Sequence, residues 1–170
     1  MTFANPQAQP PSFNANEFRA ALGMFATGVT IVTARTVGGD LVGLTANSFN
    51  SVSMTPPLVL WSLSCSAATL AAFSTGSHYA INILSVDQKD LATQFASKQG
   101  DRWAGAAYTL GASGAPLLDG AVAQFECFNR SRYEEGDHVI FVGEVERCNQ
   151  RIGAAPLLFH GGKFYTEHPL

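Results

Sequence analysis

The chain has 170 residues with a formal net charge of −3, of which 46% are hydrophobic and 14% are charged. One compact domain of this length buries about two-thirds of its unfolded surface on folding. The sequence holds no cluster of Lys and Arg of the kind that binds nucleic acids or anionic membranes. It also holds no apolar stretch approaching the roughly 18 residues of a membrane span. We therefore expect a cytoplasmic protein with no nucleic-acid or membrane partner.

The first 13 residues predict a mobile arm, because three prolines stand there among Gln, Asn and Ala. Residues 14–170 show no internal repeat and no boundary, and are expected to form one domain. A helix is predicted from Glu17 to Phe25, with Asn14 or Asn16 as its N-cap. Its apolar residues recur on one face, at Phe18, Leu22 and Phe25.

Strands are predicted after Gly28, which should end that helix, as short apolar or β-branched runs bounded by turn residues. These runs are Val29–Ala34, Leu41–Asn47, Leu58–Leu63, Tyr79–Leu84, Ala121–Tyr133 and Val139–Cys148, followed by a hairpin over Leu157–Tyr165. Two more helices are predicted, one over Ser66–Phe73 and one that opens with the S-x-x-Q capping box at Ser85. The Gly/Ala/Pro-rich stretch Gly100–Leu118 is expected to be irregular.

About seven short strands with a few helices predict a mainly β fold, a closed or nearly closed antiparallel barrel with peripheral helices. The chain lacks regular strand–helix alternation and a G-x-G-x-x-G turn, so a Rossmann domain is not expected.

The cysteines Cys65, Cys127 and Cys148 are odd in number and widely spaced. They predict neither a zinc site nor a disulfide framework, and we expect small apolar fillers in the reduced state. The four histidines are scattered without the spacing of metal ligands, so no metal site is expected.

The most informative segment runs from Gly43 to Leu63 and combines many short hydrogen-bonding side chains with almost no charge. Such a composition can hold a flat polar ligand without placing ionised groups in a core. Strand alternation puts Gly43, Thr45 and Asn47 on one face, where the glycine lets a ring or a backbone approach closely. The alternative is a Ser/Thr-rich loop that hydrogen-bonds to its own backbone.

Two further clusters could meet a phosphate. Ser62, Ser64, Ser66 and Thr69 run from a strand end into a predicted helix start, although Ser66 could equally be a simple N-cap. Lys98 and Arg102 stand among aromatic residues at a predicted helix end, and either could meet a phosphate or a ring edge. The alternative is that the neighbouring aromatic residues are only core.

His138 opens a strand directly after an acidic turn that favours its charged form. At a barrel rim it could bond a substrate amide or transfer a proton, or it could be an ordinary surface residue at a turn. The sequence shows no nucleophile elbow, no Cys–His pairing and no closely spaced carboxylates, so hydrolytic chemistry is not supported.

Five motifs in order resemble one known family. They are F-x3-L-G-x-F-A-T-G-V-T-I-V-T from Phe18, G-L-T-A-N-S-F from Gly43, S-x2-P-P-L-V from Ser53, G-D-H-x-I-F-x-G-x-V from Gly136 and P-L-L-F from Pro156. From about Glu17 to Tyr165, the chain resembles the small flavin reductase components of two-component flavin-dependent monooxygenases. The resemblance implies an antiparallel, Greek-key-like split barrel, a homodimer, and reduction of FMN or FAD by NADH or NADPH. The reduced flavin would then leave for a separate oxygenase.

The resemblance also implies a role for particular positions. The isoalloxazine would be lined by Gly43, Leu44, Thr45, Asn47 and Ser48. The ribityl and phosphate part would be held by Ser62, Leu63, Ser64, Ser66 and Thr69, and the far side closed by Phe95, Ala96 and Asp101. His138, as the catalytic residue, would face the nicotinamide together with Phe159, His160, Gly161 and Gly162.

Two other functions are compatible with these residues. One is a split-barrel oxidase that keeps its FMN, and the other is a flavin-binding or electron-transfer module without NADH turnover. The residues alone decide neither FMN against FAD nor NADH against NADPH.

Overall fold

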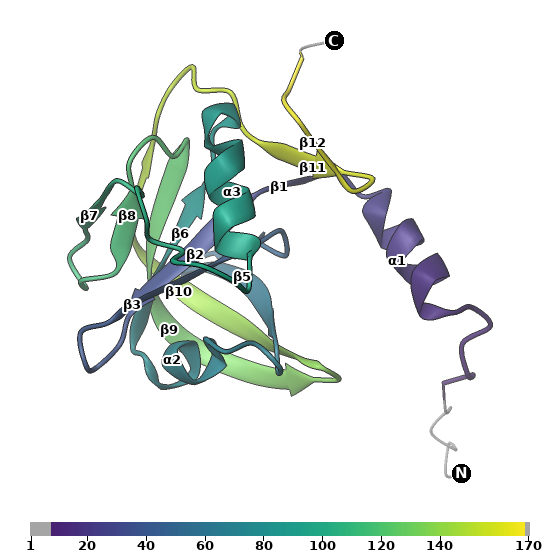
Figure 1. Cartoon of the computed structure of the whole chain (residues 1–170). Helices are drawn as coiled ribbons and strands as arrows, with labels where there is room; N and C mark the ends of the chain where they lie inside the picture. The colour runs from purple at the N-terminus through teal and green to yellow at the C-terminus, as the bar shows by residue number, and fades with distance from the viewer. Residues whose placement is uncertain (1–7, 169–170) are drawn as a thin grey trace.

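The structure is a computed structural model in which residues 8–168 are described. The predicted mobile arm therefore lies partly outside the described residues. The described part consists mostly of β-strands with a few short helices (Figure 1), as the sequence predicts.

A seven-stranded sheet forms the body of the molecule, in the order β3-β2-β6-β9-β10-β5-β4 with every neighbouring pair antiparallel. Its strands are β2 (Thr30–Arg35), β3 (Leu41–Ala46), β4 (Asn50–Met54), β5 (Pro57–Ser64), β6 (His78–Ile83), β9 (Ala123–Glu135) and β10 (His138–Gln150). The long hairpin β9–β10 and the hairpin β2–β3 lie where the sequence predicts them. Strand β4 falls in the Ser/Thr-rich segment and was not predicted.

The two edge strands are β3 and β4, and no ladder of backbone hydrogen bonds joins them. The Ser48 side chain instead links the end of β3 to β5. Ser48, just after β3, donates its hydroxyl to the Ser62 carbonyl of β5 at 3.2 Å and accepts the Ser62 N–H at 2.9 Å. The side chain thus satisfies two backbone groups of β5 that a neighbouring strand would otherwise pair.

Two small sheets flank the body. Strands β1 (Thr27–Gly28), β11 (Leu158–His160) and β12 (Lys163–Tyr165) form one of them, which contains the predicted C-terminal hairpin. Strands β7 (Tyr108–Leu110) and β8 (Pro116–Leu118) form the other, within the stretch predicted to be irregular. That prediction was wrong because strands of three residues are too short to show alternation among so many Gly, Ala and Pro residues.

Helix α1 (Ala15–Gly23) begins two residues earlier than predicted and ends at Gly23, two residues before the predicted Phe25. Asn14 is its N-cap: the side chain accepts the N–H groups of Asn16 and Glu17, and Glu17 reaches back to the Asn14 N–H at 2.8 Å. This capping box sets the start of the helix. No residue of α1 is buried, and the helix stands apart from the body in Figure 1.

The second helix, α2 (Leu70–Thr75), is shorter than the predicted Ser66–Phe73. Turns occupy residues 65–69, and the hydroxyl of Ser64, at the end of β5, accepts the Ser66 N–H there at 3.2 Å. Such local side-chain bonds compete with helix formation. Ser66 is therefore not a helix N-cap. A 3₁₀ turn (Val86–Gln88) and α3 (Lys89–Ala96) follow β6, and the predicted capping box at Ser85 is present.

The body has two apolar clusters on opposite faces of β2, since Val32 belongs to one and Ile31 to the other. The inner-face cluster centres on Trp61, which stacks on Phe141 with ring centroids 4.8 Å apart. The outer-face cluster lies under α3 and includes Phe95. Cys127 belongs to the inner-face cluster, and burial raises the pKa of its thiol to about 12. Cys65 and Cys148 are exposed, so the prediction of apolar fillers was correct for Cys127 alone.

Candidate functional site

A cleft with two adjoining compartments lies between α3, the end of β3 and the C-terminal hairpin. One compartment is apolar with a volume of about 370 Å³, and the other is polar with a volume of about 660 Å³. Both are lined by the same four residues, Thr45, Ala46, Asn47 and Ala96. The end of β3 therefore forms the junction of the two compartments.

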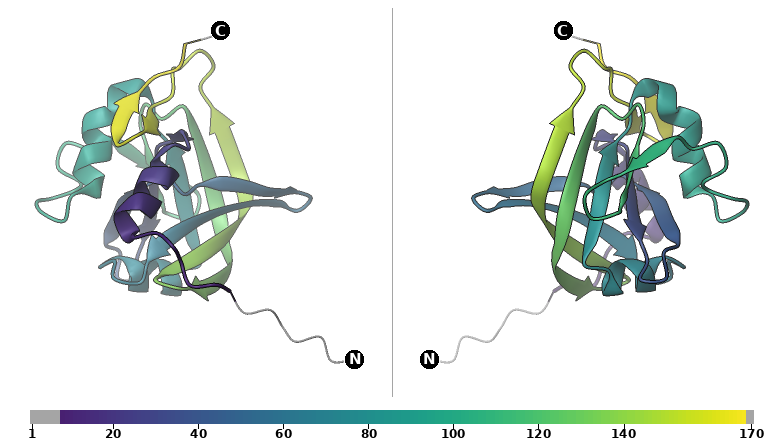
Figure 2. Two further views of the ribbon diagram at one scale, coloured as in Figure 1. Left: turned by 90° about the vertical axis from the view of Figure 1, so that its right-hand side faces the viewer. Right: turned by 90° about the vertical axis from the view of Figure 1, so that its left-hand side faces the viewer.

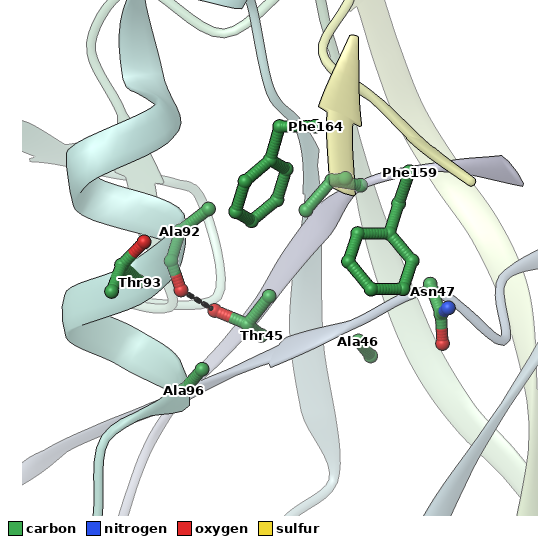
Figure 3. Close-up of a pocket in the computed structure, with 9 residues that line it drawn as sticks. Thr45, Ala46, Asn47, Ala92, Thr93, Ala96, Phe159 and Phe164 are labelled. Carbon is green, nitrogen blue, oxygen red and sulfur yellow. Dashed lines mark hydrogen bonds between the residues drawn. The ribbon is translucent and has the colours of Figure 1, made fainter. Parts of the chain in front are cut away.

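The apolar compartment lies between a helix face and two aromatic rings (Figure 3). Helix α3 contributes only small side chains, at Ala92, Thr93 and Ala96. The rings of Phe159 on β11 and Phe164 on β12 form the other wall, with centroids 5.5 Å apart. The two rings are inclined by 62° to each other, so one of them can stack on a bound ring while the other meets it with an edge.

The two walls are held in register by contacts between β3 and α3. Thr45 donates its hydroxyl to the Ala92 carbonyl at 2.6 Å, the dashed contact in Figure 3. Gly43, one step along the same strand face, lies directly under Phe95. A Cβ at Gly43 would come within 2.7 Å of that ring. The sequence predicted that Gly43 lets a ring or a backbone approach closely. The ring that approaches is the side chain of Phe95.

The polar compartment has no carboxylate in its lining, and its ionisable residues are all basic, namely Lys98, Arg102 and His138. The chain as a whole carries a net charge of −3, so the compartment differs in sign from the overall charge. It favours an anionic or electron-rich ligand over a cationic one. Ser62, Ser64, Ser66 and Thr69 supply hydroxyl groups along one wall.

His138 lies on that wall because the first residue of β10 pairs with Ser64, the last of β5. Its Nδ1 lies 2.7 Å from the Asp137 carboxylate. The hydrogen bond to His138, and then the charge of His138, lower the pKa of Asp137. Asp137 therefore orients the imidazole and leaves Nε2 for another partner.

The opposite wall is the loop after α3, which is fastened to the free edge of β3. Arg102 donates to the Gly43 carbonyl from Nη1 and to the Ser97 carbonyl from Nε, both at 2.9 Å. Trp103 donates from Nε1 to the Leu41 carbonyl at 3.1 Å. These side-chain donors occupy carbonyls that a strand edge would otherwise leave exposed.

Most of the residues predicted for the site line one of the two compartments. They are Leu44, Thr45, Asn47, Ser48, Ser62, Leu63, Ser64, Ser66, Thr69, Phe95, Ala96, His138 and Phe159. The structure thus brings together segments that lie more than a hundred residues apart in the sequence. Phe159 lines the apolar compartment and His138 the polar one, so the residues predicted to face one nicotinamide lie in different compartments.

Five predicted residues do not line either compartment. Gly43 lies under Phe95, and the Asp101 carboxylate accepts the Trp103 N–H at 2.9 Å. His160, Gly161 and Gly162 lie at the tip of the C-terminal hairpin, where the Gly161 N–H donates to the Gly23 carbonyl at the end of α1. Their predicted contact with ligand remains a prediction.

The sequence interpretation missed several lining residues, among them Val29, Ala46, Ala92, Thr93 and Phe164. Ala92 and Ala96 are spaced i, i+4 on α3, so a helix face made of small residues was the available signal. Phe164 is the register partner of Phe159 in the predicted hairpin. The other residues carry no local signal, because only packing places them at the cleft.

Residues 22–168 match the model of the flavin reductase like domain. The chain belongs to this family. It is 45% identical to the FMN reductase (NADH) SmoA of Agrobacterium fabrum over 91% of its own length and 87% of that protein. It spans about half, 49%, of a longer relative, a probable flavin reductase of Rhizobium meliloti that is 44% identical.

Solved structures of flavin reductases also superpose on this chain. The NADH:FAD oxidoreductase SgcE6 of Streptomyces globisporus, in complex with NAD and FAD fragments, superposes with a TM-score of 0.86 at 39% identity, covering 91% of this chain and 93% of that one. The styrene monooxygenase flavin reductase of Pseudomonas putida S12 superposes with a TM-score of 0.83 at 35% identity, covering 91% and 99%.

These comparisons confirm the family predicted from the five motifs and the predicted split-barrel fold, and the relatives are named for flavins and nicotinamide coenzymes. The cleft fits such ligands, since it pairs an apolar compartment with a polar, basic compartment. Within residues 8–168, no three His, Cys, Asp or Glu side chains lie close enough to hold a metal ion. None of the helices in the same range is long and apolar enough to cross a membrane.

Proposed function

We propose that this flavin reductase transfers a hydride from NADH to free FMN or FAD and releases the reduced flavin to a separate oxygenase. The observation that carries the proposal is the pair of compartments that meet at Thr45 and Asn47. Two planar molecules bound there would lie side by side at the junction. Relatives named as reductase components of monooxygenases support the oxygenase as the partner.

Hydride transfer between the two cofactors requires few reactive groups from the protein. The hydride passes from the nicotinamide C4 to the flavin N5 and a proton is taken up, so no protein nucleophile is required. The residues of the cleft provide orientation and close approach, which alone can lower a barrier by several kcal/mol. A cleft of small, hydroxyl and aromatic side chains is sufficient for these tasks.

Each wall has its own part in this proposal. Ala92, Ala96 and Phe159 hold a ring in the apolar compartment, and Asn47, which lines both compartments, meets polar ring atoms at the junction. Ser64 and Ser66, whose hydroxyls lie 2.9 Å apart, hold the polar tail of the flavin. His138 donates to the nicotinamide carboxamide where that group reaches the polar compartment.

Release of the flavin is consistent with the same lining. The cleft is open, and most of its contacts come from neutral hydroxyl and apolar groups. Few ion pairs would form with the ring, so flavin affinity should be modest and the product should leave. A flavin dissociation constant far below the cellular flavin concentration would contradict this part of the proposal.

The decisive experiment mixes the purified protein with NADH and FMN, FAD or riboflavin and follows the nicotinamide absorbance. We expect rapid loss of NADH that depends on added flavin. An oxidase that keeps its FMN would instead purify yellow and oxidise its own substrate without consuming NADH. A flavin-binding module would consume no NADH with any flavin, and that result would contradict the proposal. The same assay with NADPH tests our choice of NADH, which follows the relative named FMN reductase (NADH).

A homodimer is part of the proposal, because two elements of the single chain expose apolar side chains. Helix α1 exposes Phe18 by 51% and Leu22 by 58%, and Phe25, just after the helix, is exposed by 74%. The β4–β5 hairpin projects from the body in Figure 2 and exposes Met54 by 87%. A nine-residue helix is marginal without tertiary contacts, so a second copy is the natural cover for it.

Sedimentation equilibrium tests this part directly. We expect a mass of twice 18.0 kDa, and a shift to the single mass when Phe18 and Leu22 are both replaced by Ser. A single-chain mass for the unaltered protein would contradict the dimer. A cytoplasmic location stays a prediction.

A further inference from the structure

The loop after α3 forms one wall of the polar compartment, and Lys98 and Arg102 on this loop line it. Within residues 8–168, the backbone hydrogen bonds of residues 98–106 join these residues only to one another. Backbone groups that have no such partner in the rest of the fold depend on side chains or water. The position of this wall is therefore set by the side chains that contact the loop backbone.

Gln94, in the last turn of α3, contacts three carbonyls of the loop. Its Nε2 donates to the Ala104 carbonyl at 2.8 Å and to the Arg102 carbonyl at 2.9 Å, and the Asp101 carbonyl lies at 3.5 Å. A side-chain amide has two N–H groups, so the two short contacts use both of them. All three neighbours are acceptors, which fixes the orientation of the amide with its nitrogen toward the loop. A single side chain thus gathers the loop carbonyls at one point.

Gln94 does not itself line either compartment. The α3 residues that line the apolar compartment are Ala92, Thr93 and Ala96. Gln94 follows Ala92 by two positions, and residues two apart on a helix face different directions. Its side chain is half-buried and contacts the loop. Any effect of Gln94 on a ligand must therefore pass through the loop.

Two other side chains fasten the same loop, but to a different element. Arg102 donates to the Gly43 carbonyl at 2.9 Å and Trp103 to the Leu41 carbonyl at 3.1 Å, both on β3. Gln94 joins the loop to α3 instead. Because α3 carries one wall of the apolar compartment and the loop carries one wall of the polar compartment, the Gln94 bonds set the spacing between these two walls.

We infer that Gln94 is a positioning residue for flavin binding, because its two N–H groups hold the wall of the polar compartment in place before the flavin arrives. This inference rests on the proposed function and deepens it. A preorganised wall removes an ordering cost from binding. Without the Gln94 bonds the flavin must order the loop itself, so its affinity should fall. The apolar compartment is built on α3 and the C-terminal hairpin, so a flavin that has bound should react at nearly the same rate.

Gln94→Met tests the inference, because methionine matches glutamine in length and in helix propensity but has no donor. With NADH saturating, we expect the KM for FMN to rise about tenfold, as for the loss of paired hydrogen bonds, and kcat to stay within about twofold. Gln94→Lys has donors and a similar helix propensity, and should keep the KM within about twofold. Gln94→Glu places an acceptor against carbonyls and should raise the KM further, by about thirtyfold.

Gln99→Met is the matched control. Gln99 is exposed on the same loop and contacts Ser97 through its backbone. A local readout comes from the two tryptophans of the chain, since Trp61 is fully buried and Trp103 lies in the loop. Acrylamide should quench the fluorescence of Gln94→Met more than that of the unaltered protein, and that of Gln99→Met no more.

An unchanged KM for FMN in Gln94→Met would overturn the inference. Equal effects of Gln94→Met and Gln94→Lys would overturn it too, because the amide donors would then not be the cause. A fall in kcat at an unchanged KM would place the effect on the reacting rings, again against the inference. If the unaltered protein reduces no flavin, the proposed function itself fails, and the acrylamide quenching and the FMN dissociation constants of the same variants then decide the role of Gln94.

Discussion

Both faces of the main sheet carry a buried apolar cluster, but only the outer face leaves an open cleft beside its cluster. On the inner face, Trp61 contacts Phe141, Phe73 and Tyr79, with ring centroids between 4.8 and 5.7 Å from its own. On the outer face, α3 presents Ala92 and Ala96 to the C-terminal hairpin, and the space between them remains open. Both faces are built on the same strands, and the open space lies where α3 presents small side chains instead of large ones.

This contrast assigns stability to one face and ligand binding to the other. Large aromatic side chains fill the inner face and contribute most of the buried apolar area there. Open apolar space reduces stability in proportion to its volume, so it persists where a ligand fills it. The contrast makes opposite predictions for substitutions on the two faces.

The largest effect on stability is expected from Phe141→Ala on the inner face. The side chain is fully buried, and its removal should lower the free energy of unfolding by about 3–5 kcal/mol. Denaturant unfolding measures this change, and flavin reduction per folded molecule should stay near that of the unaltered protein. Phe128→Ala, on an exposed ring, is the control and should change stability little. A specific loss of activity in Phe141→Ala would break the contrast.

Ala96→Leu, on the outer face, should have the opposite signature. The added methyl groups enter the junction of the two compartments, and we expect kcat/KM to fall about 100-fold because the reacting rings are displaced. Ala96 is exposed, so the melting temperature should hardly change. Gln99→Leu, on an exposed residue three positions further on, serves as the control. Normal turnover in Ala96→Leu would show that the junction is not where the reaction takes place.

Gly43→Ala tests the contact that positions α3 over β3. The new Cβ would lie 2.7 Å from Phe95, so the ring and the helix must shift. We expect a loss of about 1–3 kcal/mol in the free energy of unfolding, together with a higher KM for flavin. Gly28→Ala is the matched control, because a Cβ there meets no atom within 4 Å. If Gly43→Ala and Gly28→Ala have equal effects, close packing at Gly43 is not what sets the cleft.

The smallest effect is expected from His138→Ala in the polar compartment. One hydrogen bond to the nicotinamide is worth about 1 kcal/mol, so the KM for NADH should rise about fivefold while flavin binding is largely retained. Steady-state kinetics and flavin fluorescence measure the two quantities separately. His78→Ala is the control, since that ring pairs with Glu146 outside both compartments. Unchanged NADH kinetics would make His138 a surface turn residue only.

Much of the fold could be predicted from the sequence, because it depends on interactions between residues that are close in the chain. The capping boxes at Asn14 and Ser85 depend on residues three positions apart, so each was visible in the sequence. The β-branched and alternating runs predicted the strands of the two long hairpins, and the Gly43–Leu63 segment predicted a polar binding region. The motifs in order predicted the family.

Tertiary structure decided the rest, because it depends on contacts between distant segments. The residues around Gly43 in the sequence do not predict its contact with the Phe95 ring. The residues around Arg102 likewise do not predict its hydrogen bond to the Gly43 carbonyl. The division of the cleft arises where β3, α3 and β11 meet, more than a hundred residues apart from first to last. Hydrophobic periodicity is a local property of a segment, whereas the shape of a cavity depends on which side chains the fold leaves facing each other.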